Sequence, residues 1–341
     1  MKVLSLFDGM SGGMLALKSA GIEVDTYYAS ELDKFAIAES QANFPDIIQL
    51  GDVTKWREWD IPWGEIDLLL GGSPCQGFSS SGKGLNFQDP RSKLFFEYVE
   101  ILEHIKKFNP NVKFMLENVK MKVEWENVIT SYLGVDPVFI NSADFTAQNR
   151  QRLYWCNWEI KPWDITNEVL QDIIEDDSIV DRDKAYCIDA NYAKGGNIEQ
   201  YFEKSRRQLA FYPAAIYGRR INENGKRSTS KTDRLVHCLE VQDSEKTRCL
   251  TTVPKDVLLA YIPPGRYRDA FEKLSEGVHY RKLTVKECCR LQGVPDDYFK
   301  VSSNTQAYKM LGNGWTIPVI AHILKCMEEQ WKHCGKAGRL L

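Results

Sequence analysis

Residues 3–13, VLSLFDGMSGG, place an apolar run directly before a glycine-rich turn, and a helical pattern follows from Met14 to Ala20. A short apolar run, a glycine turn and a helix in this order are typical of the first unit of a parallel α/β sheet. The alternation continues along the chain, with strands expected at 24–29, 66–70 and 113–116 and helices at 33–43 and 92–107. This pattern predicts an α/β fold, a doubly wound and mostly parallel sheet with short right-handed crossovers.

Five polar or reactive side chains follow the expected strands, each near the point where a strand ends. They are Asp8, Glu31, Asp52, Cys75 and Glu117. Because ligands of open parallel sheets bind beyond the carboxyl ends of the strands, these side chains are expected at one edge of the sheet. The sequence therefore predicts the functional site at that edge.

Cys75 lies in a turn that directly follows an apolar run and two glycines. A cysteine in this position can be an inert core residue, since free cysteines are among the most buried residues. However, residues 77–84, GFSSSGKG, are too polar and glycine-rich to pack in a core. They are typical of a loop that closes over a substrate. We therefore interpret Cys75 as a candidate nucleophile.

The turn at Gly9 and the acid at Glu31 have the order expected for a site that binds an adenosine-containing cofactor. In such sites the acid after the second strand accepts hydrogen bonds from ribose hydroxyls. The turn fits the dinucleotide motif poorly, and no P-loop lysine is nearby. A nucleoside without a pyrophosphate, such as S-adenosylmethionine, satisfies both observations. A turn needed only for packing remains the alternative for Gly12 and Gly13.

Charged residues also surround the fourth apolar run. Glu117 and Asn118 follow this run, and Arg150 and Arg152 lie two residues apart in QNRQR, 148–152, before another apolar run. Residues at i and i+2 share one side of a strand. The two guanidiniums can therefore be surface charges, or they can pair with Glu117 and a substrate carbonyl.

The composition bounds the class of protein. A chain of 341 residues exceeds one ordinary core, so a main domain and a smaller one are expected. No run of 18 apolar residues occurs and the N-terminus does not resemble a signal peptide, so a cytoplasmic protein without membrane contact is expected. The nine cysteines and five histidines show no ligand spacing, which predicts no metal site and no disulfide framework.

The net charge of −3 gives no general attraction to nucleic acid, but residues 204–234 are locally basic. This region lies in 157–278, where the alternation of strands and helices breaks down. The charges are Lys204, Arg206, Arg207, Arg219, Arg220, Lys226, Arg227, Lys231 and Arg234. They can form a solvated face or a nucleic-acid surface, and the residues alone do not separate these interpretations.

In this order, the motifs resemble the C5-cytosine DNA methyltransferases over nearly the whole chain except 157–278. The matching blocks are FDGMSG (7–12), Glu31, GDV (51–53), PCQ (74–76), ENV (117–119), QNRQR (148–152), RKLTVKECCRLQG (281–293) and LGNG (311–314). Ser11 stands where the family commonly has a glycine, and Leu32 where many members have a larger side chain. Some blocks resemble the de novo enzymes of animals, but the absence of flanking regulatory domains favours a bacterial or phage enzyme.

The resemblance implies a Rossmann-like class I methyltransferase fold with a smaller inserted target-recognition domain. The implied domains are 1–156 (catalytic and cofactor-binding), 157–278 (target recognition) and 279–341 (return to the catalytic domain). It also implies S-adenosylmethionine as cofactor, double-stranded DNA as partner and a monomer, and it is compatible with a companion restriction enzyme.

The resemblance assigns three sets of residues. The catalytic set is Cys75, Glu117, Asn118, Arg150 and Arg152. The cofactor set is Phe7, Asp8, Gly9, Met10, Ser11, Gly12, Glu31, Leu32, Asp52, Val53, Pro74, Asn313 and Gly314. The DNA set is Gln76, Ser79, Lys83, Arg206, Arg207, Arg219, Arg220, Lys226 and Arg227.

The implied mechanism begins with addition of the Cys75 thiolate to carbon 6 of a flipped-out cytosine, while Glu117 acts at ring N3. Arg152 would hold the cytosine O2, Arg150 would orient Glu117, and Asn118 would help to bind the ring. Carbon 5 then takes the methyl group, loses its proton to a base that the sequence does not identify, and Cys75 leaves.

Three alternatives remain open at this point. A transfer-RNA cytosine methyltransferase would share the fold, cofactor and nucleophile. A catalytically inactive DNA-binding subunit would keep the fold alone, and a nicotinamide-dependent oxidoreductase would share the cofactor edge.

Overall fold

This computed structural model describes residues 1–73, 93–178, 180–194, 201, 204–211, 214–221, 227–228, 232, 234–241 and 280–337. In the strands between 214 and 241 and in 332–337 it describes the backbone alone. Six predicted site residues lie outside the described residues: Pro74, Cys75, Gln76, Ser79, Lys83 and Lys226.

The chain forms two compact units. The larger consists of Met1–Glu168, Tyr186–Lys194 and Val285–Leu341, and the smaller of Val169–Ala185 and Gly195–Thr284. The smaller unit therefore overlaps most of the expected domain 157–278, although residues 157–168 and 186–194 belong to the larger unit.

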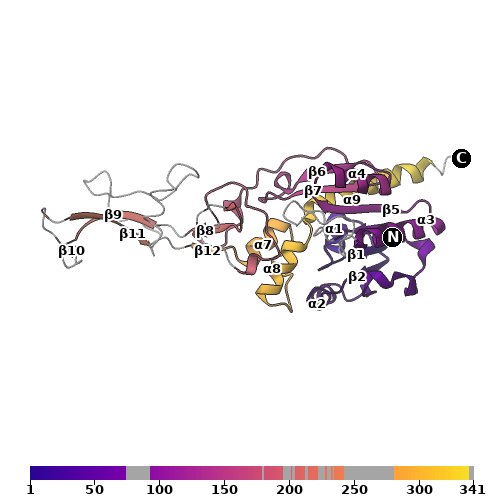
Figure 1. The fold of residues 1–341 in the computed structure, drawn as a ribbon, viewed down its shortest axis with the longest axis horizontal. Helices are drawn as coiled ribbons and strands as arrows, with labels where there is room; N and C mark the ends of the chain where they lie inside the picture. Colours follow the sequence, from indigo (N-terminus) through magenta and orange to yellow (C-terminus); the bar gives the residue numbers. More distant parts are fainter. Residues whose placement is uncertain are drawn as a thin grey trace. The chain divides into compact units, whose positions relative to one another are not determined.

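The larger unit contains a seven-stranded sheet with the order β3-β2-β1-β4-β5-β7-β6 (Figure 1). Its strands are β1 (Lys2–Leu6), β2 (Thr26–Ser30), β3 (Ile48–Gln49), β4 (Leu68–Gly71), β5 (Lys113–Val119), β6 (Pro137–Asn141) and β7 (Gln151–Cys156). The first five strands are mutually parallel, whereas β7 runs antiparallel to both β5 and β6. The expected mostly parallel α/β sheet is therefore confirmed.

Helices cover both faces of this sheet. They are α1 (Gly12–Ala20), α2 (Lys34–Asn43), α3 (Lys93–Phe108), α4 (Val123–Leu133), α7 (Val285–Gln292), α8 (Asn304–Asn313) and α9 (Ile317–Ala337). On one face, α3 buries Tyr98 and Ile105 in a core with Leu69. On the other, the start of α1 lies so close to Leu70 that a Cβ at Gly13 would be 3.0 Å from that side chain. Neighbouring residues of β4 thus face opposite layers, as the alternation of a strand requires.

Strand β5 is longer than the sequence indicated, because it continues through Glu117 and Asn118 to Val119. Its register against β7 pairs Glu117 with Tyr154 and Val119 with Arg152. Since β7 is antiparallel, the beginning of β7 lies beside the end of β5. The arginine motif therefore reaches the carboxyl edge of the sheet from a strand that starts there.

The part of the smaller unit that the structure describes contains two antiparallel sheets. One pairs β8 (Leu209–Phe211) with β12 (Tyr280–Lys282), and the other has the order β10-β9-β11, with β9 at Ala214–Ile221, β10 at Arg227–Ser228 and β11 at Arg234–Val241. Within this unit both ends of the Arg281 guanidinium bind the carboxylate of Asp176, with N–O distances of 3.0 and 2.7 Å. This fork ties the segment before the strands to β12.

Among the helices that the structure describes, none is long and apolar enough to cross a membrane. Within the same residues, no group of three or more histidine, cysteine or acidic side chains is arranged to hold a metal ion.

Candidate functional site

A pocket of about 740 Å³ lies along the carboxyl ends of the parallel strands, within the larger unit. Its walls combine the turn after β1, the residues after β2, β3 and β4, the end of β5 and the turn between α8 and α9. The predicted residues in its lining are Phe7, Asp8, Gly9, Met10, Gly12, Glu31, Leu32, Asp52, Val53, Glu117, Asn118, Arg150, Arg152, Asn313 and Gly314. The described members of the expected cofactor and catalytic sets, apart from Ser11, thus line one cavity.

The turn after β1 is held by a buried carboxylate. Asp8 accepts hydrogen bonds from Tyr27 Oη at 2.7 Å and from Ser11 Oγ at 2.6 Å. Burial raises the pKa of Asp8 to about 6, although the hydrogen bonds from Ser11 and Tyr27 oppose this change. The pKa of the Asp8 carboxyl group is therefore closer to neutral pH than that of an exposed aspartate.

Ser11 has a different place from the one expected, because it does not appear in the pocket lining. Its side chain is fully buried and also bonds Ser40 Oγ at 2.6 Å. Its backbone has a φ of 60°, a left-handed conformation that favours glycine. The family glycine is thus replaced by a residue whose hydroxyl bonds offset the strain of this conformation.

Glu31 organises the loop between β2 and α2. Its Oε2 accepts from the Gly9 N–H at 2.7 Å, and its Oε1 accepts from the N–H groups of Leu32 and Asp33 at 2.7 and 2.8 Å. The carboxylate therefore joins the turn after β1 to the loop after β2. With three of about four lone-pair positions in use, one acceptor position on Oε2 remains for a ligand.

The next wall contains Asp52 and Leu32. Asp52 Oδ1 accepts from the backbone N–H and the hydroxyl of Thr54, both at 2.9 Å, and so begins the short 3₁₀ helix η1 (Val53–Glu58). The backbone hydrogen bond from Thr54 is the main cause that lowers the pKa of Asp52. Leu32 is 68% exposed although it lines the pocket, so it offers an apolar surface to a bound ring.

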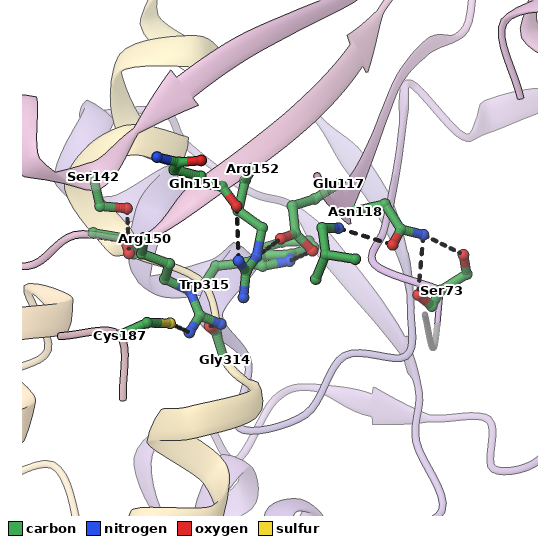
Figure 2. Close-up of polar contacts among 12 residues, drawn as sticks. Ser73, Glu117, Asn118, Ser142, Arg150, Gln151, Arg152, Cys187, Gly314 and Trp315 are labelled. Carbon is green, nitrogen blue, oxygen red and sulfur yellow. Dashed lines mark hydrogen bonds and ion pairs between the residues drawn. The ribbon is translucent and has the colours of Figure 1, made fainter. Parts of the chain in front are cut away.

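Two donors hold Glu117, one at each carboxylate oxygen (Figure 2). Arg152 Nε lies 2.7 Å from Glu117 Oε1, and the indole N–H of Trp315 donates to Oε2 at 3.3 Å. The carboxylate is nearly buried, with 9% exposure of the residue. Both oxygens are therefore oriented by the protein before any substrate binds.

Arg150 was expected to orient Glu117, but in this structure the ion pair with Glu117 is made by Arg152. Arg150 instead donates to three backbone carbonyls, Ile188 at 3.1 Å, Gly312 at 3.1 Å and Gly314 at 2.8 Å. It also donates to Cys187 Sγ at 3.3 Å. Burial lowers the pKa of the Arg150 guanidinium below its ordinary value. Arg150 is thus a buried clamp that joins three chain segments at the floor of the pocket.

Asn118 lies beside the end of β4. Its Nδ2 donates to the carbonyl and the hydroxyl of Ser73, at 3.4 and 3.3 Å, and its Oδ1 accepts from the Val119 N–H. Ser73 is the last described residue before the segment with Cys75. Asn118 therefore holds the chain two residues ahead of the candidate nucleophile.

Several lining residues were not predicted from the sequence as site residues. The most informative are Trp315, Lys309 and the segment from Cys187 to Asn191. Trp315 directly follows the predicted Gly314, so an aromatic residue beside a cofactor glycine was the available signal. Segment 187–191 carries no such signal, because it lies inside the region expected to form the other domain.

The predicted DNA residues that the structure describes are not in the pocket lining. Arg219 and Arg220 lie in β9 and Arg227 in β10, where Arg227 is in register with Ile221. Arg206 is exposed, and Arg207 has a left-handed backbone with a φ of 59°. All five belong to the smaller unit.

A profile of the family described as C-5 cytosine-specific DNA methylase matches residues 1–329. The Type II methyltransferase M1.ScrFI of Lactococcus lactis subsp. cremoris is 32% identical, over 96% of this chain and 78% of that protein. The Type II methyltransferase M.HhaI of Haemophilus parahaemolyticus is 30% identical, over 95% and 93%. M.NgoPII of Neisseria gonorrhoeae, another Type II methyltransferase, is 32% identical, over 94% and 92%.

Solved structures share the fold at low sequence identity. S. pombe Dnmt2 methyltransferase superimposes with a TM-score of 0.60 at 15% identity, covering 97% of this chain and 99% of that one. The Entamoeba histolytica methyltransferase EhMeth gives 0.61 at 14%, covering 97% and 98%. At these identities the likeness concerns the fold alone.

Proposed function

Because this chain belongs to the C-5 cytosine-specific DNA methylase family and is a DNA cytosine methyltransferase, we propose which of its residues carry the reaction. The observation that supports the proposal most directly is the position of the Glu117 side chain. Its carboxylate is held by Arg152 and Trp315 in the same pocket as the turn after β1 and Glu31. A positioned acid next to a cofactor site is one of the requirements for methyl transfer to a cytosine ring.

The pocket fits S-adenosylmethionine. The remaining acceptor position of Glu31 Oε2 suits a ribose hydroxyl, Leu32 and Val53 offer apolar surface to adenine, and Gly9 has no side chain to block the turn. Phe7, Met10, Asn313 and Gly314 would complete the walls, and Pro74 is assigned to them from its motif. S-adenosylmethionine supplies the methyl group; the residues here bind it, orient it and exclude water.

At the other end of the pocket, the protein acts on the cytosine. Cys75 would form a bond to carbon 6, and Glu117 would give a proton or hydrogen bond to ring N3, so that carbon 5 becomes nucleophilic. Arg152 would hold both Glu117 and the cytosine O2, and Asn118 would position the ring and the chain before Cys75. After methyl transfer, loss of the carbon 5 proton expels the Cys75 thiolate and restores the ring.

The smaller unit would bind duplex DNA and recognise the target sequence. Its basic residues Arg206, Arg207, Arg219, Arg220, Lys226 and Arg227 supply charge for phosphates or base edges. Gln76, Ser79 and Lys83 would contact the DNA next to the flipped base. We assign to the smaller unit, residues 169–185 and 195–284, the role that was expected of 157–278.

We propose DNA rather than transfer RNA as the substrate, and a role as the modification enzyme of a restriction system. The similar Type II methyltransferases carry names of that class and align over most of their own lengths. The enzyme would act as a monomer on each target, with a restriction endonuclease of the same specificity as its partner in the cell.

The test is methylation by the purified protein. We expect tritium from labelled S-adenosylmethionine in duplex DNA and none in transfer RNA, and bisulfite sequencing of DNA from expressing cells should reveal one short recognition sequence. Cys75→Ala should abolish incorporation, and Glu117→Gln should lower the rate by about 10²–10⁴. Label in transfer RNA alone, or full activity of Cys75→Ala, would refute the proposal.

A further inference from the structure

Trp315 occupies the turn between α8 and α9 and reaches across the pocket to Glu117. Its indole N–H donates to Glu117 Oε2 at 3.3 Å, while Arg152 contacts the other carboxylate oxygen, Oε1 (Figure 2). An indole can donate one hydrogen bond and accept none. This N–H therefore has one partner, and the partner is the acid of the proposed reaction.

The Trp315 ring also lies close to a glycine that follows β4 and to two glycines at the start of α1. A Cβ at Gly72, after β4, would be 2.9 Å from Trp315 Nε1 and 3.1 Å from Glu117 Oε2. At the start of α1, a Cβ at Gly13 would be 3.6 Å from Trp315 Cζ3, and one at Gly12 would be 3.9 Å from Trp315 Cβ. Trp315 therefore contacts the start of the cofactor-turn helix and the Glu117 carboxylate at once.

The backbone on both sides of Trp315 is held firmly. The Gly314 carbonyl accepts from Arg150 at 2.8 Å, and the Thr316 hydroxyl donates to Gln292 Oε1 at 2.8 Å. Thr316 is 2% exposed, so this second bond is shielded from water. A ring with anchored neighbours and packed faces has little freedom to move away from Glu117.

We propose that Trp315 is a positioning residue that couples the cofactor half of the pocket to Glu117. The inference rests on the proposed function of Glu117. With Arg152 on one oxygen and Trp315 on the other, the carboxyl group is locked in one orientation. Because the ring also lies against the start of α1, the same side chain fixes the acid relative to the turn that lines the cofactor half of the pocket.

The decisive variants separate the N–H from the ring. Trp315→Phe keeps most of the ring and removes only the donor. We expect its single-turnover rate of methyl transfer, at saturating DNA and S-adenosylmethionine, to fall about tenfold, as a factor of ten corresponds to ~1.4 kcal/mol. The Kd of Trp315→Phe for S-adenosylmethionine should change less than about twofold. Trp315→Ala, which also removes the ring, should both lower the single-turnover rate and raise this Kd.

A double-mutant cycle with Glu117→Gln tests whether Trp315 acts through Glu117. In the Glu117→Gln background, Trp315→Phe should have a smaller effect on the residual rate, because the amide offers one acceptor oxygen where the carboxylate offers two. The control is Trp56→Phe, because the Trp56 indole also donates to a carboxylate, Glu97, at 3.0 Å, but lies outside the pocket lining. That variant should keep the full rate.

The inference is overturned if Trp315→Phe has the unmutated rate, or if its effect is equally large in the Glu117→Gln background. If thermal melting shows that Trp315→Phe folds poorly, Gly72→Ala replaces it as the test. The added methyl group lies against the same N–H···O contact, so this variant should also slow the single turnover about tenfold. An unaltered rate in Gly72→Ala would then count against the inference. If Glu117→Gln itself is fully active, the proposed function fails and not the coupling alone.

Discussion

Arg152 Nε lies 2.7 Å from Glu117 Oε1, and both side chains are less than 15% exposed. The pair joins β7 to β5, which are antiparallel neighbours in the sheet. Ion pairs on protein surfaces contribute little because water and salt screen them, but a largely buried pair leaves an uncompensated charge when one partner is removed. The arrangement of the site therefore depends on both members.

Replacing Arg152 by lysine should preserve the charge and lose the planar fork. A lysine ammonium cannot hold Glu117 and a substrate oxygen in the same fixed geometry. We expect kcat to fall more than tenfold. Arg57→Lys, which alters the exposed pair with Glu100, is the control and should leave kcat unchanged. Wild-type kcat in Arg152→Lys would contradict the assignment.

Replacing Arg150 should affect stability before chemistry. Its guanidinium donates hydrogen bonds to the carbonyls of Ile188, Gly312 and Gly314. A methionine at this position would remove all three of these hydrogen bonds. We expect Arg150→Met to lower the free energy of unfolding by about 2–4 kcal/mol, measured by urea denaturation. Arg290→Met removes an exposed fork with Asp296 and should cost less than about 1 kcal/mol. If the two variants lose the same free energy of unfolding, the buried contacts of Arg150 contribute no more to stability than an exposed ion pair.

Glu31→Gln should weaken cofactor binding. The amide NH₂ cannot accept from the backbone N–H groups, so either Gly9 or the pair Leu32 and Asp33 loses its acceptor. We expect the Kd for S-adenosylmethionine, measured by calorimetry, to rise about 10- to 100-fold. The control Glu65→Gln changes an exposed ion pair with Lys2 and should leave the Kd as it was. A Kd for Glu31→Gln within twofold of wild type would contradict the role of Glu31.

The carboxyl group of Asp8 should make stability depend on pH in an unusual direction. Since its folded pKa is raised to about 6 from 3.8, the folded state binds the proton more tightly than the unfolded chain. Ionised Asp8 therefore costs stability above pH 6, by about 3 kcal/mol at ~1.4 kcal/mol per pKa unit, and this cost disappears as the pH falls to 3.8.

Asp8→Asn removes this titration. The stability of Asp8→Asn relative to wild type should rise by about 3 kcal/mol between pH 4 and pH 7, in urea unfolding at a series of pH values. Asp25→Asn provides a control of opposite sign, because hydrogen bonding to the N-terminus lowers the pKa of Asp25. If the stability of Asp8→Asn relative to wild type does not change over this pH range, the pKa of Asp8 is not raised by burial in the folded protein.

The sequence was sufficient for the sheet and for most of the pocket walls. Strands such as Leu68–Gly71 are continuous apolar runs, and the topology of parallel sheets brings their ends together, so Asp8, Glu31 and Glu117 could be placed at one edge. The family profile confirmed the methyltransferase fold and function that the motifs implied.

The partners of individual side chains could not be predicted in this way. Arg150 and Arg152 are the same residue type and lie only two positions apart. In the structure, however, Arg150 donates to backbone carbonyls whereas Arg152 binds Glu117. The difference arises because Arg150 precedes β7 while Arg152 lies within it. It also depends on Ile188, which a segment distant in sequence brings to Arg150.

The path of residues 186–194 has a consequence for engineering. These residues belong to the larger unit, while the chain on either side of them belongs to the smaller one. Transplanting the smaller unit from a relative is thus not a single cassette exchange: it requires two inserts, 169–185 and 195–284, with the native 186–194 kept between them. A hybrid that also replaced Ile188 and its neighbours would exchange part of the pocket wall together with the smaller unit.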